Sequence, residues 1–381
     1  MGKGFYLLNL LFICSQVSFT DQRAYQHGID FIPLGNGKYY LIWASSGIPP
    51  TGEDKKGNWT HNIYYSKIIS RNIEINPVKI IGKAEAQEPA SSAISSDGRI
   101  CITMEDGWNV KNGIAQRFGI YDTGMNPIKP YPIMVLDGGH SGHTAAVKNR
   151  FIIFYSNGWV DGGGVDNLGT GDDVLAKIYT SSGKFIKKID IAVSKKSRDW
   201  WPLIAGSDTT ACLIWQRFIK GKKYSRLMCS IIDPAEGKIV KANFILENNL
   251  KYYTYSVEYI PELKYFIIFG AYKKNGGFVF LIDQAGNVIN VNRTIPSIVR
   301  ESRPIISKNR PGVLIAQPIS PSGLMLLSCA KDGIIKYEKT LDDSYVWGYS
   351  GTDGIFVNSG TVYIVSLSPE GLVEKTFNIP E

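Results

Sequence analysis

Two of the chain's four histidines, His140 and His143, stand three residues apart in the stretch GGHSGHTAAV. An apolar, strand-like run follows them, and then a glycine-rich loop with several aspartates, GWVDGGGVDNLGTGDD. A histidine titrates near neutral pH, so it can act as a general base or acid, and it is also a common metal ligand. The stretch is therefore consistent with a catalytic corner, a metal site or a strand with polar residues at its mouth.

Arginine, tyrosine and tryptophan recur at comparable places further along the chain, in RDWWP, WQRF, YYTYS and RESRP. Together with histidine, they are the residues that removal of the C5 proton of a uronic acid requires. An arginine neutralises the sugar carboxylate, a histidine takes the proton, and a tyrosine or histidine protonates the departing O4. We expect catalytic roles for His143, His140, Arg217 and Tyr255, and substrate contacts from Arg198, Trp200, Tyr253, Tyr259, Arg300 and Arg303.

Two other chemistries are less favoured. Glycoside hydrolysis in its common form needs two carboxylates that flank one bond. The sequence offers Glu88 and the aspartates of the loop but no clear pair at corresponding strand mouths. Metal catalysis by His140 and His143 would need a third ligand, and aspartate-rich glycine loops more often bind calcium or simply turn. We expect no required cofactor, and a structural calcium or zinc ion stays open.

A repeated pattern indicates which elements position these residues. A turn followed by a five- or six-residue apolar strand recurs near residues 38, 99, 150, 210, 264, 312 and 354. A strand–turn–strand segment with glycine or proline in its turn falls between successive copies, as in IYTSSGKFIKKI and LIDQAGNVINVN. With an inner strand before each apolar strand, every unit has four strands.

Seven such units predict an all-β fold, a seven-bladed β-propeller of four-stranded antiparallel blades, with the ring closing on itself. A pair of stacked β-sandwiches is the alternative, but it would not explain seven similar units. The inner strands begin about ten residues before each apolar strand, where the chain carries His27, Glu88, His140, Arg198, Tyr253 and Arg300. We expect these positions to lie on one face, near long loops such as the one that contains His61.

Composition bounds the class of protein. The 381 residues carry a net charge of +8 without a basic tract or a nucleic-acid motif, which indicates an acidic polysaccharide or a membrane surface as partner rather than nucleic acid. Residues 1–20, MGKGFYLLNLLFICSQVSFT, have the pattern of a secretory signal, and no later segment looks transmembrane. We expect export to the periplasm or medium, and a monomer formed by one domain over residues 21–381.

Four cysteines follow the signal-like segment, Cys101, Cys212, Cys229 and Cys329, each within an apolar run. Their spacing is not that of a zinc cluster, so we interpret them as small buried hydrophobic residues. Export would permit a disulfide, but the sequence does not choose a pairing.

The segments GHTAAV, GWVDGGG, RDWWP and WQR resemble the seven-bladed propeller enzymes with BNR-type repeats, a group that includes ulvan lyases and rhamnose–glucuronate-cleaving relatives. The resemblance covers most of the chain after residue 20 and is strongest from 138 to 218. It implies that His143, Arg217 and one of Tyr253, Tyr255 and Tyr259 take the places of the lyases' catalytic histidine, arginine and tyrosine. The lyases' second histidine and intermediate tyrosine have no clear counterpart here.

These observations predict a carbon–oxygen lyase that acts on uronate-containing, ulvan-type and sulfated oligosaccharide by β-elimination. The missing counterparts argue against cleavage within a polymer, so elimination of water from a terminal uronate is one variant. Hydrolysis of a terminal rhamnose–glucuronate link is the alternative within the substrate class. A carbohydrate-binding propeller without catalysis is the alternative from another class.

Overall fold

The computed structural model describes residues 26–46, 61–69, 72–73, 77–83, 86–107, 113–158, 173–309, 312–346, 353–358, 361–368 and 371–378. All regular structure in these ranges is β-strand. No helix in the described part of the chain is long and apolar enough to cross a bilayer. The signal-like segment and most of the aspartate-rich loop, including Asp161, Asp166 and Asp172, lie outside the described residues.

The described strands form six antiparallel sheets in chain order. The first sheet contains β1 (Gln26–Gly35), β2 (Lys38–Ser45), β3 (Asn62–Ile69), β4 (Asn72–Ile73) and β5 (Val78–Ile81). The second contains β6 (Gln87–Ile94), β7 (Ile100–Asp106), β8 (Ala115–Tyr121) and β9 (Pro127–Asp137). The third contains β10 (His140–Val147), β11 (Arg150–Asn157), β12 (Asp173–Thr180) and β13 (Phe185–Ala192).

A seven-stranded sheet follows, with β14 (Asp199–Gly206), β15 (Ala211–Phe218), β16 (Ser225–Asp233), β17 (Lys238–Ile260), β18 (Tyr265–Tyr272), β19 (Gly277–Asp283) and β20 (Val288–Ile295). The 23-residue strand β17 pairs with β16 through its first part and with β18 through its last part. The fifth sheet contains β21 (Ile305–Asn309), β22 (Gly312–Pro318), β23 (Ser322–Cys329) and β24 (Ile335–Val346), and the last contains β25 (Asp353–Asn358), β26 (Thr361–Ser368) and β27 (Gly371–Asn378).

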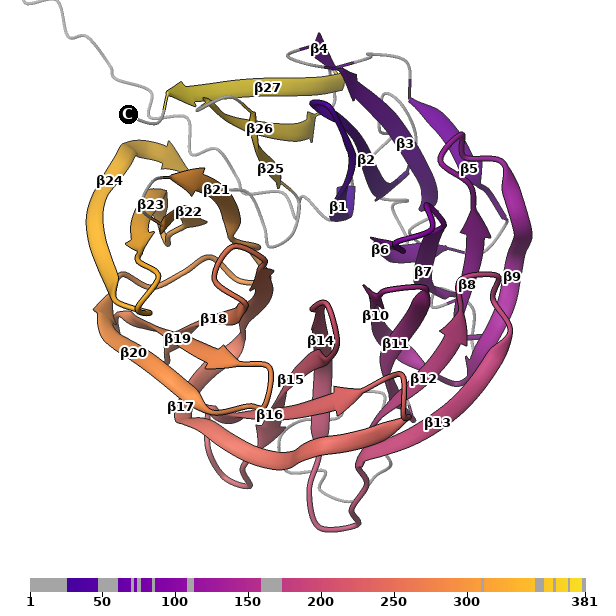
Figure 1. Cartoon of the computed structure of the whole chain (residues 1–381), viewed down its shortest axis with the longest axis horizontal. Helices are drawn as coiled ribbons and strands as arrows, with labels where there is room; N and C mark the ends of the chain where they lie inside the picture. Colours follow the sequence, from indigo (N-terminus) through magenta and orange to yellow (C-terminus); the bar gives the residue numbers. More distant parts are fainter. Residues whose placement is uncertain are drawn as a thin grey trace, which may run out of the picture.

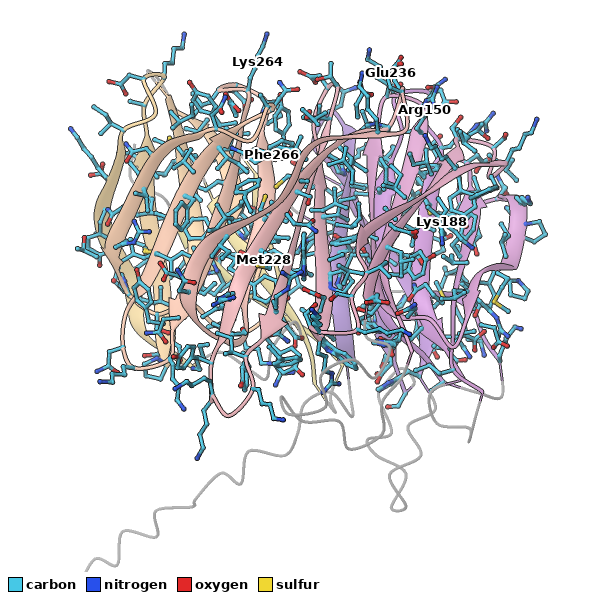
Figure 2. The ribbon with its side chains drawn as sticks, turned by 90° about the horizontal axis from the view of Figure 1, so that it is seen from below. Arg150, Lys188, Met228, Glu236, Lys264 and Phe266 are labelled. Atoms are coloured by element: carbon cyan, nitrogen blue, oxygen red, sulfur yellow. The ribbon has the colours of Figure 1, made fainter. Side chains whose placement is uncertain are left out.

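The sheets stand around a central axis, as in a β-propeller, with the first strand of each sheet innermost (Figure 1). Both predicted elements of the repeat are present. The apolar runs form β2, β7, β11, β15, β18 and β22, and they start within one residue of the predicted positions. Figure 2 shows Arg150, Glu236 and Lys264 together at one end of the ring, so the inner and outer hairpin turns share a face.

The core lies between neighbouring sheets, because the second strand of each sheet is buried on both faces. Every residue of β7 is buried, for example, whereas β9 and β13 at the outer edge expose most of theirs. One hydrophobic cluster joins Phe154 on β11 to Trp215 on β15, whose rings lie 6.0 Å apart. Continuous apolar runs are what strands with two covered faces require, which explains the predicted pattern.

The glycine in each outer turn has a structural reason. Gly183, Gly286 and Gly333 have φ of 80°, 86° and 83°, a region that favours glycine. A side chain of the preceding outer strand reaches each turn: Lys129 Nζ donates to the Gly183 carbonyl (3.1 Å), and Lys241 Nζ to that of Gly286 (2.7 Å). These contacts tie neighbouring outer strands together around the ring.

The C-terminal sheet differs from the prediction. The segment near residue 354 was expected to be a second strand, but β25 takes the inner place, where it contacts β1 and β21. β26 takes the second place, since Tyr363 packs with Leu41 and Trp43 of β2. The described part of this sheet thus has three strands rather than four.

The four described cysteines are buried and free, in agreement with their interpretation as small hydrophobic residues. Cys212 and Cys229 lie on the adjacent strands β15 and β16, with their sulfur atoms 3.7 Å apart.

Candidate functional site at the strand entrances

The entrances of the inner strands share an unusual backbone geometry. A register shift occurs near the start of β1, β6, β10 and β14 and between Leu250 and Tyr255 of β17. The entrances of β1, β10, β14 and β17 each contain a residue with φ between 54° and 66°, and so does the segment before β21. These residues are Gly28, Ser141, Trp201, Tyr253 and Glu301, in that order. Such bulges turn a side chain away from the strand's regular alternation and are common beside functional sites.

Two of these left-handed residues are large aromatics, which is costly. Trp201 and Tyr253 both have φ of 57°, and a bulky residue in this region costs about 1–3 kcal/mol. Glycine would serve the backbone at lower cost. The two side chains are therefore candidates for a role that offsets the strain.

Four half-buried side chains, from three inner strands and from the segment before β21, form a continuous row. His143 on β10 contacts Trp201 on β14, with the ring centroids 5.9 Å apart. Trp201 in turn contacts Tyr253 on β17 at 5.6 Å, and the Arg300 guanidinium lies 4.4 Å from the Tyr253 ring centroid. We call these four residues the entrance row. It combines an imidazole, an indole, a phenol and a guanidinium on a partly exposed surface.

A second, buried layer supports the entrance row. His140 is fully buried and its ring lies 4.4 Å from that of Trp200, which is 7% exposed. The guanidinium of Arg198, 2% exposed, lies over the rings of Trp200 (4.7 Å) and Phe218 (5.1 Å). Burial, aided by the nearby Arg198 charge, lowers the pKa of His140 to about 3, so this histidine is neutral at physiological pH.

This burial corrects three expectations. His140 was expected to exchange catalytic roles with His143, but a fully enclosed imidazole cannot reach a substrate. Trp200 and Arg198 were expected to contact substrate, and both are buried in the supporting layer. Of the two adjacent tryptophans, Trp201 is the one in the entrance row.

The contact that His143 makes fixes its tautomer. Its Nδ1 lies 3.1 Å from the Ser141 carbonyl oxygen, which can only accept a hydrogen bond. In the neutral imidazole, Nδ1 therefore carries the proton and Nε2 the lone pair, as a general base requires.

Side chains of strands that precede each inner strand along the chain hold both sides of the entrance row. The Ser141 N–H donates to Glu105 Oε1 at 2.5 Å, and the Gly142 N–H donates to Gln116 Oε1 at 2.9 Å. In the same way, the Tyr253 N–H donates to Gln216 Oε1 at 3.1 Å. Glu105 and Gln216 occupy the same place near the ends of β7 and β15, so the left-handed backbone at each entrance is fixed by its neighbour.

Tyr253 is a neutral phenol with two arginines nearby. Burial raises its pKa, and the charges of Arg300 and Arg198 oppose that rise. The side chain therefore retains its proton at neutral pH and can act as a proton donor.

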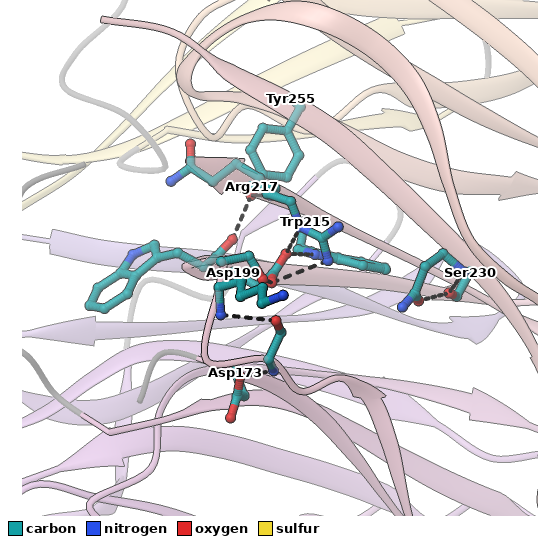
Figure 3. A network of polar contacts seen from close by, with 12 residues as sticks. Asp173, Asp199, Trp215, Arg217, Ser230 and Tyr255 are labelled. Carbon is teal, nitrogen blue, oxygen red and sulfur yellow. Dashed lines mark hydrogen bonds and ion pairs between the residues drawn. The ribbon is translucent and has the colours of Figure 1, made fainter. Parts of the chain in front are cut away.

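Arg217, expected to neutralise a substrate carboxylate, is engaged with the protein's own carboxylate. Its Nε lies 2.7 Å from Asp199 Oδ1, and its Nη2 lies 3.2 Å from Oδ2 (Figure 3). Asp199 is fully buried and also accepts from Trp215 Nε1 at 2.6 Å and from the Ser197 hydroxyl at 2.7 Å. Arg217 thus has an internal carboxylate partner, and its expected role with a substrate carboxylate is not what this contact shows.

Two further tyrosines do not belong to the entrance row. Tyr255 is fully buried, and its hydroxyl donates to the Trp201 carbonyl and accepts from the Gln216 N–H at 3.2 Å. Its expected role as catalytic acid is therefore wrong. Tyr259 lies near the other end of the inner strand, where its hydroxyl donates to Asp208 of the β14–β15 turn at 3.2 Å, so it cannot share a substrate with Tyr253.

Arg303 joins three inner elements instead of binding at the entrances. Its guanidinium pairs with Asp30 of β1 and with Glu258 of β17, the latter at 3.2 Å. Burial raises the pKa of Glu258, and the Arg303 charge opposes this rise.

The carboxylates described at the entrances are also paired, which bears on hydrolysis and metal binding. Glu88 lies against the buried imidazole of His61, and Asp199 is held by Arg217. Among the residues that the structure describes, no three His, Cys, Asp or Glu side chains come together to hold a metal ion. The side chain of His27 lies outside the described set.

The sequence analysis assigned the substrate contact to Trp200 rather than to its neighbour Trp201, and it did not find Glu105 or Gln216. The available signal was the repeat itself. It places a polar residue at the same position near the end of the apolar strand, Glu105 in MEDG and Gln216 in WQRF. The partner of each lies on a later inner strand, Ser141 on β10 and Tyr253 on β17, a relationship that spacing alone does not reveal.

No family model matches the chain, and no curated protein matches it in sequence. Solved structures of several classes share its fold. A polysaccharide lyase, Uly1, is 9% identical with a TM-score of 0.54, covering 93% of this chain and 90% of its own. The lectin BP39L from Burkholderia pseudomallei is 10% identical with a TM-score of 0.59, covering 93% and 96%.

Hydrazine synthase from Kuenenia stuttgartiensis is 13% identical with a TM-score of 0.56, covering 96% of this chain and 99% of that one. These identities are low, so the likeness defines the fold class alone: an all-β protein of propeller type. The same fold carries a polysaccharide lyase, a lectin and a hydrazine synthase, so function must come from the site.

Proposed function

We propose that the chain is a seven-bladed β-propeller that acts on uronate-containing oligosaccharide by β-elimination, as a polysaccharide lyase or as a dehydratase at a terminal uronate. The seven-stranded sheet supports the blade count. If β17 serves as the outer strand of one blade and the inner strand of the next, this sheet counts as two blades and the ring has seven.

The entrance row carries the proposal. It places a base, an aromatic surface, a protonated phenol and a cation in sequence, from β10, β14, β17 and the segment before β21. Aromatic rings bind the C–H faces of sugars, and a guanidinium pairs with carboxylate. Arg300 takes this role in place of Arg217, because its side chain is 35% exposed and its guanidinium lies beside the Tyr253 ring.

The reaction then follows from the residue chemistry. Nε2 of His143 removes the C5 proton while Arg300 stabilises the charge that develops on the uronate carboxylate. The electron pair of the C5–H bond forms the C4–C5 double bond, the C4–O4 bond breaks, and Tyr253 gives its proton to O4. A sugar on O4 leaves as a shortened chain, and a free O4 hydroxyl leaves as water.

In this proposal the substrate is an acidic oligosaccharide, and the reaction takes place outside the cytoplasm. The net charge of +8 supports a polyanion, such as a sulfated ulvan-type glycan, and the signal-like residues 1–20 support export of a monomeric protein. No cofactor is assigned a step.

A carbohydrate-binding protein without catalysis is the second candidate. It is favoured by the engagement of Arg217 and Tyr255 in internal contacts, because the resemblance to lyases gave these two residues chemical roles. The aromatic rings of the entrance row would suffice for binding.

Product analysis distinguishes these functions. The protein is incubated with uronate oligosaccharides, and ultraviolet absorbance and mass are followed. β-Elimination yields a conjugated double bond, with fragments for a lyase and loss of water without shortening for a dehydratase. Fragments that gain water without the chromophore indicate hydrolysis, and binding without any product indicates the second candidate.

A further inference from the structure

A cavity of about 420 Å³ lies away from the entrance row, between the outer parts of the first two sheets. Its walls are β5 with the two residues that follow it, Tyr65 of β3, the end of β8, and the first residues of β9. We call this cavity the rim pocket. Its volume is within the range of small-ligand sites in proteins.

One wall of the rim pocket is fixed by a buried network. The Tyr131 hydroxyl donates to the carboxylate of Asp106, which is fully buried. Asp106 also pairs with Arg117 Nη1 at 2.5 Å. Burial and the adjacent carboxylate raise the pKa of Tyr131, so the ring is a neutral, immobilised aromatic surface.

The opposite wall is tied to the same frame. The Tyr65 ring packs edge-on against Tyr40 with centroids 5.4 Å apart. The Tyr40 hydroxyl in turn donates to the carbonyl of Thr123, in the turn between β8 and β9, at 2.7 Å. This bond holds the first sheet to the second, so the pocket is preformed.

The charge of the rim pocket has one sign. Lys79 and Lys83 line it, and its described lining residues include no aspartate or glutamate. The Lys83 Nζ lies 5.3 Å from the Tyr131 ring centroid, and its backbone N–H is held by Asn62 Oδ1 at 3.2 Å and Gln87 Oε1 at 3.3 Å. Two ammonium groups beside tyrosine and proline side chains suit a ligand with an apolar ring face and a negative group.

We propose that the rim pocket is a second saccharide-binding site, which takes one acidic sugar unit through its carboxylate or sulfate. Lys79 and Lys83 supply the charge, and Tyr65 and Tyr131 supply the surface against which the sugar ring packs. The choice of an acidic sugar rests on the proposed function. A site at the outer edge would hold a polyanionic chain to the protein while another part of the chain reaches the entrance row.

The test uses the full chain with Trp201→Ala as the parent, to weaken the entrance row. A uronate tetrasaccharide and its carboxyl-reduced counterpart are titrated by calorimetry into the parent, into Lys79→Gln with Lys83→Gln, and into Lys238→Gln. Lys238 is an exposed lysine on β17 and serves as the control for loss of a surface lysine outside the rim pocket. Circular dichroism checks that each variant folds.

The parent should retain one site for the acidic tetrasaccharide, weakened by added salt. The double lysine variant should bind about tenfold more weakly, and Lys238→Gln should match the parent. Equal affinity in the double variant, equal binding of the carboxyl-reduced sugar, or no residual binding in the parent would overturn the proposal. Failure of the proposed function would give a different set of results. Wild type would form no unsaturated product, and Trp201→Ala would bind the tetrasaccharide as well as wild type does. The double lysine variant would still bind it more weakly.

Discussion

The Arg300 guanidinium lies over the ring of Tyr253, with its Cζ 4.4 Å from the ring centroid. The two residues come from different inner elements, and the Tyr253 backbone is held in the left-handed region by Gln216. This arrangement presents the phenol and the cation together, and it allows their contributions to be separated by substitution.

Tyr253→Phe should abolish turnover while leaving binding intact. The ring and its contacts with Trp201 and Arg300 remain, but the proton donor is lost, which should lower kcat by about 10²–10⁴-fold. Initial rates of unsaturated product and calorimetric affinity for the same oligosaccharide measure both effects. A kcat within threefold of wild type would exclude Tyr253 as the acid.

Asp199→Asn should destabilise the fold. The buried carboxylate accepts hydrogen bonds from Trp215, Arg217 and Ser197, so its neutralisation leaves a guanidinium without its charge partner. We expect a loss of about 2–4 kcal/mol in the free energy of unfolding, measured by urea titration.

Asp190→Asn is the matched control for that substitution. Asp190 pairs with Lys188 at 2.9 Å, but both side chains are about half exposed, so the change should stay within about 0.5 kcal/mol. Equal effects of the two substitutions would contradict the structural role of Asp199.

Gly286→Ala tests the outer turns. The backbone is left-handed at φ of 86°, and a Cβ atom would lie 2.8 Å from Lys241 Cδ. Gly35→Ala shares the backbone conformation at φ of 80° but meets nothing within 4 Å. Both should lose about 1 kcal/mol from strain, and Gly286→Ala should lose more because the lysine contact is displaced. Thermal unfolding that ranks Gly35→Ala as the less stable variant would count against the contact.

The buried His140 should make stability depend on pH. Its pKa is about 3 in the folded protein and 6.5 without burial, so the unfolded chain binds more protons between these values. The contribution of the neutral, buried His140 to the free energy of unfolding is fully present above pH 6.5 and is lost as pH falls toward 3. The loss amounts to about 1.4 kcal/mol at pH 5.5. Urea unfolding at pH 7.5 and 5.5 measures the loss, which should shrink in His140→Asn.

Much of the fold follows from the sequence, because the repeat combines two strong local signals. Apolar runs such as β7 and β18 must be covered on both faces, and a left-handed glycine marks outer turns such as that of Gly286. The last sheet was misassigned because β25 has the short apolar pattern of a second strand. Its inner place is set by contacts with β1 and β21.

The site was predictable by location but not by individual role. Spacing brings His143, Tyr253 and Arg300 to one end of the inner strands, where the structure has them in a row. The backbone bulges decide which of two neighbouring side chains faces outward. They bury Trp200 and Tyr255 and leave Trp201 in the entrance row. The neutralisation of Arg217 by Asp199 depends on a strand pairing in register, which composition does not show.

The most direct test of the proposed chemistry compares wild type with His143→Ala on uronate oligosaccharides, by ultraviolet absorbance and mass. Wild type should form unsaturated product, and His143→Ala should fold with the same circular dichroism spectrum and form it at least about 100-fold more slowly. Full activity in His143→Ala, or products that gain water without the chromophore, would contradict β-elimination at the entrance row.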